Sequence, residues 1–227
     1  MEHTRNSILL ALSDADSALL APHLQLVELP REQRLERRGR VADHVYFIER
    51  GVACATAGDG GVEVGMIGRE GVVGVPTLLG AQLSPYDVQM ITPGTARRTS
   101  VAAIRDAMNQ SPSFRNAIGQ YVLKLLLQVM REAQSNARAT LDARVVRWLL
   151  MMHDRVDGDE LHLTHERLAA LLGVRRAGVS VAAKKLERTG VIALHRGAIV
   201  VRDRKRLEDG SAGAYITGDW ETSETRR

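Results

Sequence analysis

The chain has 227 residues, 44% hydrophobic and 26% charged, a composition typical of a globular protein with room for two domains. Its apolar runs are far shorter than the roughly 20 residues of a membrane span, and its first residues lack a secretory signal pattern. We therefore expect a cytoplasmic protein with no membrane partner. The single cysteine, Cys54, excludes a disulfide within the chain and multi-cysteine zinc or iron–sulfur sites. We expect Cys54 to be a small buried strand residue, with a redox-sensing thiol as the alternative.

Positive charge is concentrated in one segment of the chain. Residues 164–206 hold 11 Lys/Arg and 3 Asp/Glu, whereas the residues before and after this segment each carry more acidic than basic side chains. A basic block favours a polyanion, because each neutralised phosphate releases condensed counterions. The charge pattern therefore points to a nucleic-acid partner.

The N-terminal half is predicted to be mainly β-structure. Apolar spacing over residues 7–22 indicates short helices, with Ser13 or Asp14 as the cap of the second. Asp59-Gly60 is typical of a hairpin turn. The β-type runs, separated by glycines, are residues 45–49, 52–56, 62–67, 88–91 and 95–99. Short, regularly spaced strands predict a small barrel or sandwich, which we extend with its flanking helices over residues 1–110.

A long helix is predicted next. A short helix over residues 101–110 precedes it, and a further helix over residues 141–156 follows it. The apolar seam of the long helix has heptad spacing and is formed by Ile118, Val122, Leu125 and Val129. We assign residues 111–138 to a helix that forms a homodimer interface through this seam. The alternative is an ordinary core helix of a single chain.

Residues 164–189 have the pattern of a helix-turn-helix. Thr164 is expected to cap a helix that ends at the turn residue Gly173, and a second helix runs from about Arg175 to Arg188. The second helix has one apolar and one basic face, as a recognition helix in a DNA major groove requires. Short β-runs on either side of His195-Arg196-Gly197 predict a wing with a basic tip.

We expect DNA contacts from exposed polar residues of this region. The candidates are Arg175, Arg176, Ser180, Lys184, Thr164, His165 and Arg196. Arg176 is the candidate for a bidentate contact to a guanine edge, and Thr164, His165 and Arg196 are placed for the phosphate backbone. The acidic residues 207–227 are predicted to be a disordered tail.

The chain resembles the Crp/Fnr family, that of the cyclic-AMP receptor protein, over roughly residues 20–205. The similarity lies in HVYFIERGVACATA and VGMIGREGVVGVP in the β-part and in LTHERLAALLGVRRAGVSVAAKKLERTGVI in the C-terminal part. The resemblance implies an α+β fold with an N-terminal β-roll of the cyclic-nucleotide-binding type, a central dimerisation helix and a winged helix-turn-helix over residues 139–206. It implies a transcription regulator rather than an enzyme, which binds two-fold symmetric DNA as a homodimer, with RNA polymerase as a candidate partner.

The chain departs from the family pattern in the β-roll. Family members that bind cyclic AMP have a Gly-Glu pair, whose Glu holds the ribose, and about ten residues later an Arg-Ser pair, whose Arg pairs with the phosphate. The corresponding pairs here are Gly74-Val75 and Ser84-Pro85, with Arg69 and Glu70 nearby. Without the guanidinium, a bound phosphate loses its counter-charge. We expect no cyclic-nucleotide cofactor and an unidentified effector, with Arg69, Glu70, Gly74, Val75 and Ser84 as candidate pocket residues.

The recognition helix also departs from the family pattern. The Arg-Glu-x-x-x-Arg pattern of the cyclic-AMP receptor protein reads Arg176, Ala177 and Val181 here. Only the first arginine is kept, so the DNA site is expected to differ from that of the cyclic-AMP receptor.

Other functions are weighed against this prediction. A cupin-type enzyme needs clustered His and Glu ligands, but the β-region has only His23 and His44, far apart, so we expect no metal site. Haem is left open by His3 together with these two histidines. The remaining alternative is an effector-binding β-roll that signals through protein contact rather than DNA.

Overall fold

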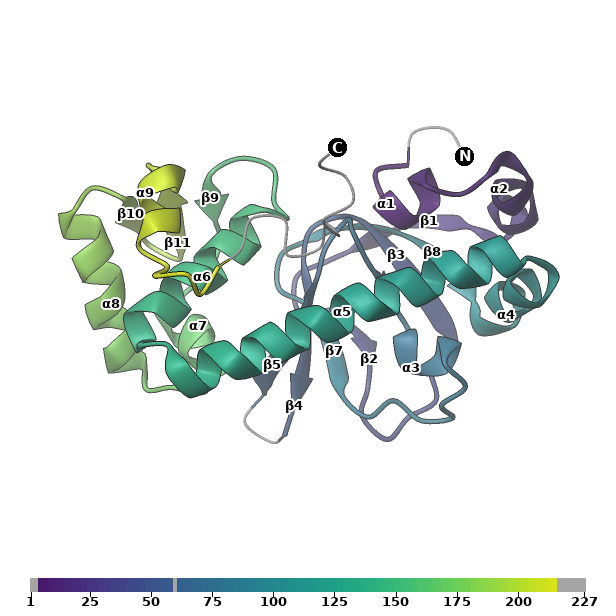
Figure 1. The fold of residues 1–227 in the computed structure, drawn as a ribbon, viewed down its shortest axis with the longest axis horizontal. Helices are drawn as coiled ribbons and strands as arrows, with labels where there is room; N and C mark the ends of the chain where they lie inside the picture. Colours follow the sequence, from purple (N-terminus) through teal and green to yellow (C-terminus); the bar gives the residue numbers. More distant parts are fainter. Residues whose placement is uncertain (1–3, 59–60, 216–227) are drawn as a thin grey trace. The chain divides into compact units, whose positions relative to one another are not determined.

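The computed structural model describes residues 4–58 and 61–215. Helices and strands both contribute, as expected for an α+β chain (Figure 1). The chain divides into two compact units. The first consists of residues 1–55 and 65–126, and the second consists of residues 56–64 and 127–227. The long helix α5 therefore contributes residues to both units.

The first unit contains two short helices followed by a β-roll. Ser13 caps the second helix, as predicted. The elements in chain order are α1 (Ser7–Leu10), α2 (Asp14–Leu20), the 3-10 turn η1 (Ala21–His23), β1 (Gln25–Leu29), β2 (Arg34–Glu36), β3 (His44–Arg50), β4 (Ala53–Ala57), β5 (Val62–Ile67), β6 (Val72–Val73), α3 (Val75–Leu78), β7 (Asp87–Met90), β8 (Gly94–Ser100), α4 (Val101–Gln110) and α5 (Pro112–Arg138). All five predicted strands are confirmed, whereas β1, β2, β6 and α3 were not predicted.

Two four-stranded sheets form the β-roll, in the orders β1-β8-β3-β6 and β2-β7-β4-β5. β3 and β8 pair antiparallel along their length, and the register shifts between Ile48 and Arg50. Gly94 allows the backbones to approach at this irregularity, since a Cβ atom there would lie 1.9 Å from the Arg50 carbonyl oxygen. Cys54 is fully buried in β4, which confirms its interpretation as a core residue. The predicted Asp59-Gly60 turn lies outside the described residues.

A buried amide joins the N-terminal helices to the β-roll. The Asn6 side chain caps α1, and its amide nitrogen donates to the carbonyl oxygens of Ile48 and Gly71 at 2.9 and 2.8 Å. Asn6 is fully buried, so these bonds replace the water that its amide loses on folding.

The first half of α5 belongs to the core of the first unit. Ile118 is 1% exposed within the main hydrophobic cluster, and Val122 and Leu125 pack against the same cluster. The prediction that Ile118 faces a second chain is therefore wrong, whereas an interface role of the partly buried Val122 and Leu125 stays a prediction. Heptad spacing defines an apolar stripe but not what covers it, and here the chain's own core covers it. Val129, the fourth predicted residue, is 37% exposed.

A neighbouring stripe of α5 remains exposed instead. It consists of Leu123, Leu126, Leu127 and Met130, with Leu126 53% and Met130 60% exposed. The spacing of 3, 1 and 3 residues places these side chains on one side of the helix. The helix is thus apolar on two sides, of which one lies in the core.

The second unit contains the helix-turn-helix and a three-stranded sheet, in the order β10-β11-β9 (Figure 1). Its further elements are α6 (Leu141–His153), β9 (Glu160–Leu161), α7 (His165–Leu172), α8 (Arg176–Arg188), β10 (Ile192–His195), β11 (Ala198–Val201) and α9 (Arg204–Asp209). The predicted wing is β10 and β11, joined at Arg196-Gly197. In contrast to the expectation of a disordered tail from residue 207, Leu207 and Tyr215 are buried. The rest of that predicted tail, residues 216–227, lies outside the described residues.

Buried polar groups hold α6 in the second unit. Trp148 is 2% exposed, and its indole nitrogen donates to the carboxylate of Glu63, whose pKa is raised by burial. Arg147 pairs with Glu132 of α5. Each of these buried charged groups has a partner, as the cost of removing a charge from water demands. Within the residues described, no helix has both the length and the apolar character needed to cross a bilayer.

Two glycines with a left-handed backbone, Gly173 after α7 and Gly190 after α8, differ in the space around them. Gly173 and Gly190 both have a left-handed backbone, with φ of 64° and 73°. A Cβ atom at Gly173 would lie 3.1 Å from Val62 Cγ2, whereas nothing lies within 4 Å of one at Gly190. Each alanine substitution should lower the free energy of unfolding by about 1–2 kcal/mol, because alanine is strained at positive φ. Gly173→Ala should cost more than Gly190→Ala in urea denaturation. Equal losses would show that Val62 moves aside without cost.

Candidate nucleic-acid interface

Capping residues set the boundaries of the helix-turn-helix. The Thr164 hydroxyl accepts a hydrogen bond from the Arg167 backbone N–H at 3.1 Å and so caps α7, as predicted. Gly173 ends α7 in the left-handed conformation that glycine adopts most easily. α8 then begins at Arg176, with Arg175 as its N-cap residue.

One face of α8 is fixed against α6 and α7. Val179, Ala182 and Ala183 are almost completely buried on that face. The alanines are small, and a Cβ atom at Gly178 would lie only 2.7 Å from the Leu141 side chain of α6. Small residues therefore let α8 approach its neighbours closely, which holds the helix rigidly on one side.

The opposite face of α8 is exposed. The predicted contact residues Arg175, Arg176 and Lys184 are all exposed, and so are Ala177 and Val181. The face is therefore basic at its start and in its third turn, with an apolar section between them.

A cavity of about 280 Å³ joins the N-terminus of α7, the start of α8 and the wing. Its lining residues are Leu163, Thr164, His165, Glu166, Arg176, His195, Gly197 and Ala198. Three predicted contact residues therefore meet here, and Arg196 is exposed on the wing between two lining residues. His195 and Glu166 were not among the predicted contact residues, although each is adjacent in sequence to one of them.

His165 links α7 to the exposed face of α8. Its Nδ1 atom lies 3.1 Å from the hydroxyl of Ser180. Burial, followed by the positive charges of Arg176 and Lys184, lowers the pKa of His165, while Glu187 acts in the opposite direction. These interactions bring five of the seven predicted residues together: Thr164, His165, Arg176, Ser180 and Lys184. Hydroxyl, imidazole and guanidinium groups around a helix N-terminus are suited to binding a phosphate.

Lys185, which follows Lys184 on α8, is paired with an acidic residue. The ammonium group of Lys185 lies 2.7 Å from the carboxylate of Asp142 in α6. Lys184, in contrast, is exposed, and its charge is close enough to His165 to act on the pKa of that residue. The two adjacent lysines therefore differ in the charge that they offer to a ligand.

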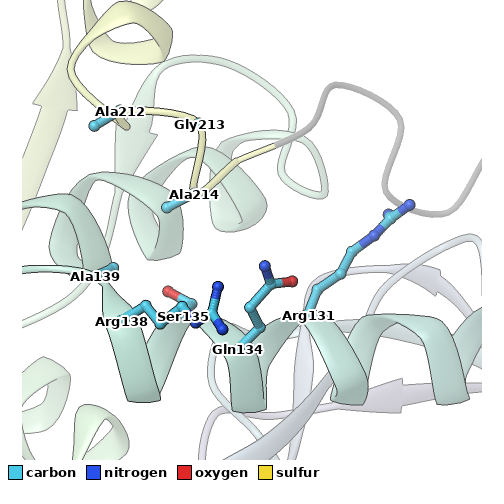
Figure 2. A pocket seen from close by; sticks show the side chains of 8 residues that line it. All are labelled: Arg131, Gln134, Ser135, Arg138, Ala139, Ala212, Gly213 and Ala214. Atoms are coloured by element: carbon cyan, nitrogen blue, oxygen red, sulfur yellow. The ribbon is translucent and has the colours of Figure 1, made fainter.

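A second cavity, of about 290 Å³, lies between α5 and the segment that follows α9 (Figure 2). Its lining residues are Arg131, Gln134, Ser135, Arg138, Ala139, Ala212, Gly213 and Ala214. Ser135 is 7% exposed, and its hydroxyl has no hydrogen-bond partner among the described residues. Figure 2 shows the Arg131 side chain extending away from Ser135 and from residues 212–214. The sequence analysis did not single out these residues.

Two of the candidate effector residues surround a buried carboxylate. The Ser84 hydroxyl oxygen lies 2.8 Å from Glu36 Oε2 and 2.8 Å from the carbonyl oxygen of Tyr86. Burial raises the pKa of Glu36, and the nearby backbone N–H of Gly74 acts in the opposite direction, while Glu36 Oε1 has no hydrogen-bond partner among the described residues. The sequence analysis missed Glu36, because nothing local indicates that it meets residues 38 and 48 positions away.

The other candidate effector residues are placed differently. Val75 is buried in the short helix α3. Arg69 and Glu70 lie in the turn between β5 and β6, where the Glu70 carboxylate accepts from the backbone N–H of Gly68 at 3.0 Å. Of the histidines considered for haem, His23 is in η1 and His44 in β3, while His3 lies outside the described residues. The described part of the chain contains no group of three His, Cys, Asp or Glu side chains suited to a metal ion.

Comparison with known proteins covers both parts of the chain. Residues 26–111 match the model of the cyclic nucleotide-binding domain, and residues 143–209 match that of the Crp-like helix-turn-helix domain. The chain is 26% identical, over 209 residues, to the CRP-like cAMP-activated global transcriptional regulator of Mycobacterium tuberculosis, covering 84% of this chain and 89% of the relative. It is 25% identical to the global nitrogen regulator of Synechococcus elongatus, covering 86% of this chain and 93% of the relative.

Solved structures have the same fold. A CRP-family transcriptional regulator from Thermus thermophilus superposes with a TM-score of 0.72 at 18% identity, covering 85% of this chain and all of that one. FixK2 from Bradyrhizobium japonicum superposes with a TM-score of 0.70 at 18% identity, covering 82% of this chain and 96% of that one. With a cyclic nucleotide-binding domain followed by a Crp-like helix-turn-helix, the chain belongs to the Crp/Fnr family of transcriptional regulators.

Proposed function

We propose that this regulator binds a two-fold symmetric DNA site in the cytoplasm as a homodimer and is not switched by cyclic AMP. The observation that carries the proposal is the convergence of Thr164, His165 and Arg176 on one cavity beside the exposed face of α8. RNA polymerase is the proposed protein partner at promoters. The proposed role is DNA recognition, without an enzymatic reaction.

The residues around the cavity divide into two kinds of contact. Arg176 is at the first turn of α8, where a recognition helix reaches base edges, and its guanidinium fits the O6 and N7 acceptors of guanine. Thr164 and His165, at the N-terminus of α7, and Arg196, on the wing, are proposed to bind phosphates. Phosphate contacts position the protein, whereas the base contact distinguishes sequences.

Arginine and lysine substitutions on α8 test this division. Arg176→Ala should reduce the discrimination between the preferred and a mutated site by about 1–3 kcal/mol, because a bidentate base contact is lost. Lys184→Ala should weaken binding to both sites evenly and reduce its salt dependence. Competition binding to a site selected from a random DNA pool measures both effects.

Lys185→Ala is the matched control for Lys184→Ala, since Asp142 already pairs with Lys185 and a smaller effect is expected. An equal loss on all sequences for Arg176→Ala would contradict its base contact. Little affinity for DNA at any salt concentration would instead favour a β-roll signalling module that acts through protein contact.

The exposed stripe of α5 supports the proposed homodimer. Covering exposed leucine and methionine side chains with a second copy of the chain lowers the free energy by roughly 25 cal/mol per Å² of apolar area buried. The four residues lie on one side of a long helix, so a two-fold axis beside α5 would bring identical stripes together. A contiguous apolar surface of this kind is typical of a protein interface.

Charge introduced into the stripe tests the interface. Leu126→Asp should convert the dimer to a monomer and lower the affinity for the two-fold symmetric site at least ten-fold, because a carboxylate would be buried without a partner. Sedimentation velocity measures the oligomeric state. Leu79→Asp is the control, since Leu79 is also exposed, at 64%, but lies outside α5. A Leu126→Asp protein that stays dimeric would rule out this interface.

The contacts of Glu36 support independence from cyclic nucleotides. The Ser84 hydroxyl, at the position corresponding to the family's Arg-Ser pair, is already bonded to the Glu36 carboxylate, and the Gly74 backbone lies near the same carboxylate. A cyclic phosphate placed there would have to displace this carboxylate and would find no guanidinium at residue 84. The mycobacterial relative is named as cAMP-activated, and this chain is proposed to differ from it.

Calorimetry tests this part of the proposal. Neither cyclic AMP nor cyclic GMP should bind at micromolar concentrations, because the Ser84 hydroxyl is bonded to Glu36 and no guanidinium stands at residue 84. Ser84→Arg restores the residue type that the family pattern has there and should increase affinity if the alignment of the two sites is correct. Micromolar binding of either nucleotide to the unmodified protein would overturn the proposal.

A further inference from the structure

The centre of the exposed face of α8 is apolar in its first two turns. At 100° per residue, the line opposite the buried Val179, Ala182 and Ala183 runs through Ala177 and Val181 and continues through Lys184 and Arg188. Val181 is 56% exposed, and Ala177 is also exposed. The polar Arg176 and Ser180 lie on one flank of this line. The N-terminal half of this face therefore presents methyl groups, and the C-terminal half presents charged groups.

Folding does not account for a valine at this position. Valine has a lower helix propensity than alanine or lysine, because its branched Cβ restricts χ1. A side chain that remains more than half exposed also gains little from burial. The buried face of α8 is complete without Val181, since Val179, Ala182 and Ala183 fill it. The exposed Val181 is therefore available to contact an apolar group of a ligand of this face.

The ligand of this face is DNA in the proposed function, on which the inference rests. The N-terminal residues of a recognition helix contact base edges in the major groove. Among the groups displayed there, the C5-methyl of thymine is the apolar one, and short aliphatic side chains contact it. We propose that Val181, supported by Ala177, reads the 5-methyl group of a thymine in each half-site. Arg176, on the flank, would then read a guanine on a neighbouring base pair.

Removing single methyl groups from the DNA tests this assignment. In a site selected from a random pool, each thymine is replaced in turn by deoxyuridine, which lacks only the methyl group. One position per half-site should lose affinity about four-fold, the effect of one buried methyl, and replacement in both half-sites should lose about fifteen-fold. Replacement elsewhere in the site should change affinity less than two-fold.

Substitution of the valine completes the test. Val181→Ala, which suits an exposed helix position, should bind the thymine and deoxyuridine sites within two-fold of each other. Val41→Ala is the matched control, because Val41 is also exposed, at 66%, but lies in the first unit, and the loss on deoxyuridine should persist.

Two outcomes would overturn the inference, and they are distinguishable. If the protein selects a site but no thymine methyl contributes, or if Val181→Ala leaves the thymine preference intact, then α8 does not read thymine through Val181. If the protein selects no DNA sequence, the proposed function itself fails, and the inference fails with it.

Discussion

The close packing of α8 through small residues is the constraint on which the DNA-binding unit depends. Ala182 and Ala183 have no bulk beyond Cβ, and a Cβ atom at Gly178 would require the end of the Leu141 side chain to shift. A larger residue at the fully buried Ala182 or Ala183 would overpack the contact of α8 with its neighbours. Because the inner face is held tightly, the outer face can be presented in one orientation, which recognition by side chains requires.

The charge distribution of the same unit follows from this arrangement. Burial, followed by the positive charges of Arg176 and Lys184, lowers the pKa of His165, so a charged imidazole is disfavoured there in the free protein. Lys185 is different, since Asp142 compensates its charge from α6. Arg176 therefore brings its positive charge to the cavity, and Lys184 presents its charge on the exposed face of α8.

In the first unit, the predicted effector residue Ser84 contacts a buried carboxylate. Glu36 is almost completely buried, and its Oε2 atom accepts a hydrogen bond from the Ser84 hydroxyl. Its Oε1 atom has no hydrogen-bond partner among the described residues, and burial raises the pKa of this carboxyl. The second cavity, in the other unit, is lined by one buried hydroxyl, that of Ser135, which has no hydrogen-bond partner among the described residues.

The sequence by itself determined the features that depend on neighbouring residues. The caps Ser13 and Thr164, the turn at Gly173 and the periodicities of α5 and α8 are local, and all were predicted close to their observed bounds. The family pattern added the β-roll. Tertiary structure alone decided which partner covers an apolar stripe, and for this reason Ile118 is a core residue rather than an interface residue. It also decided the pairs Glu36–Ser84 and Glu63–Trp148, because burial and long-range contact leave no periodic signal in a chain.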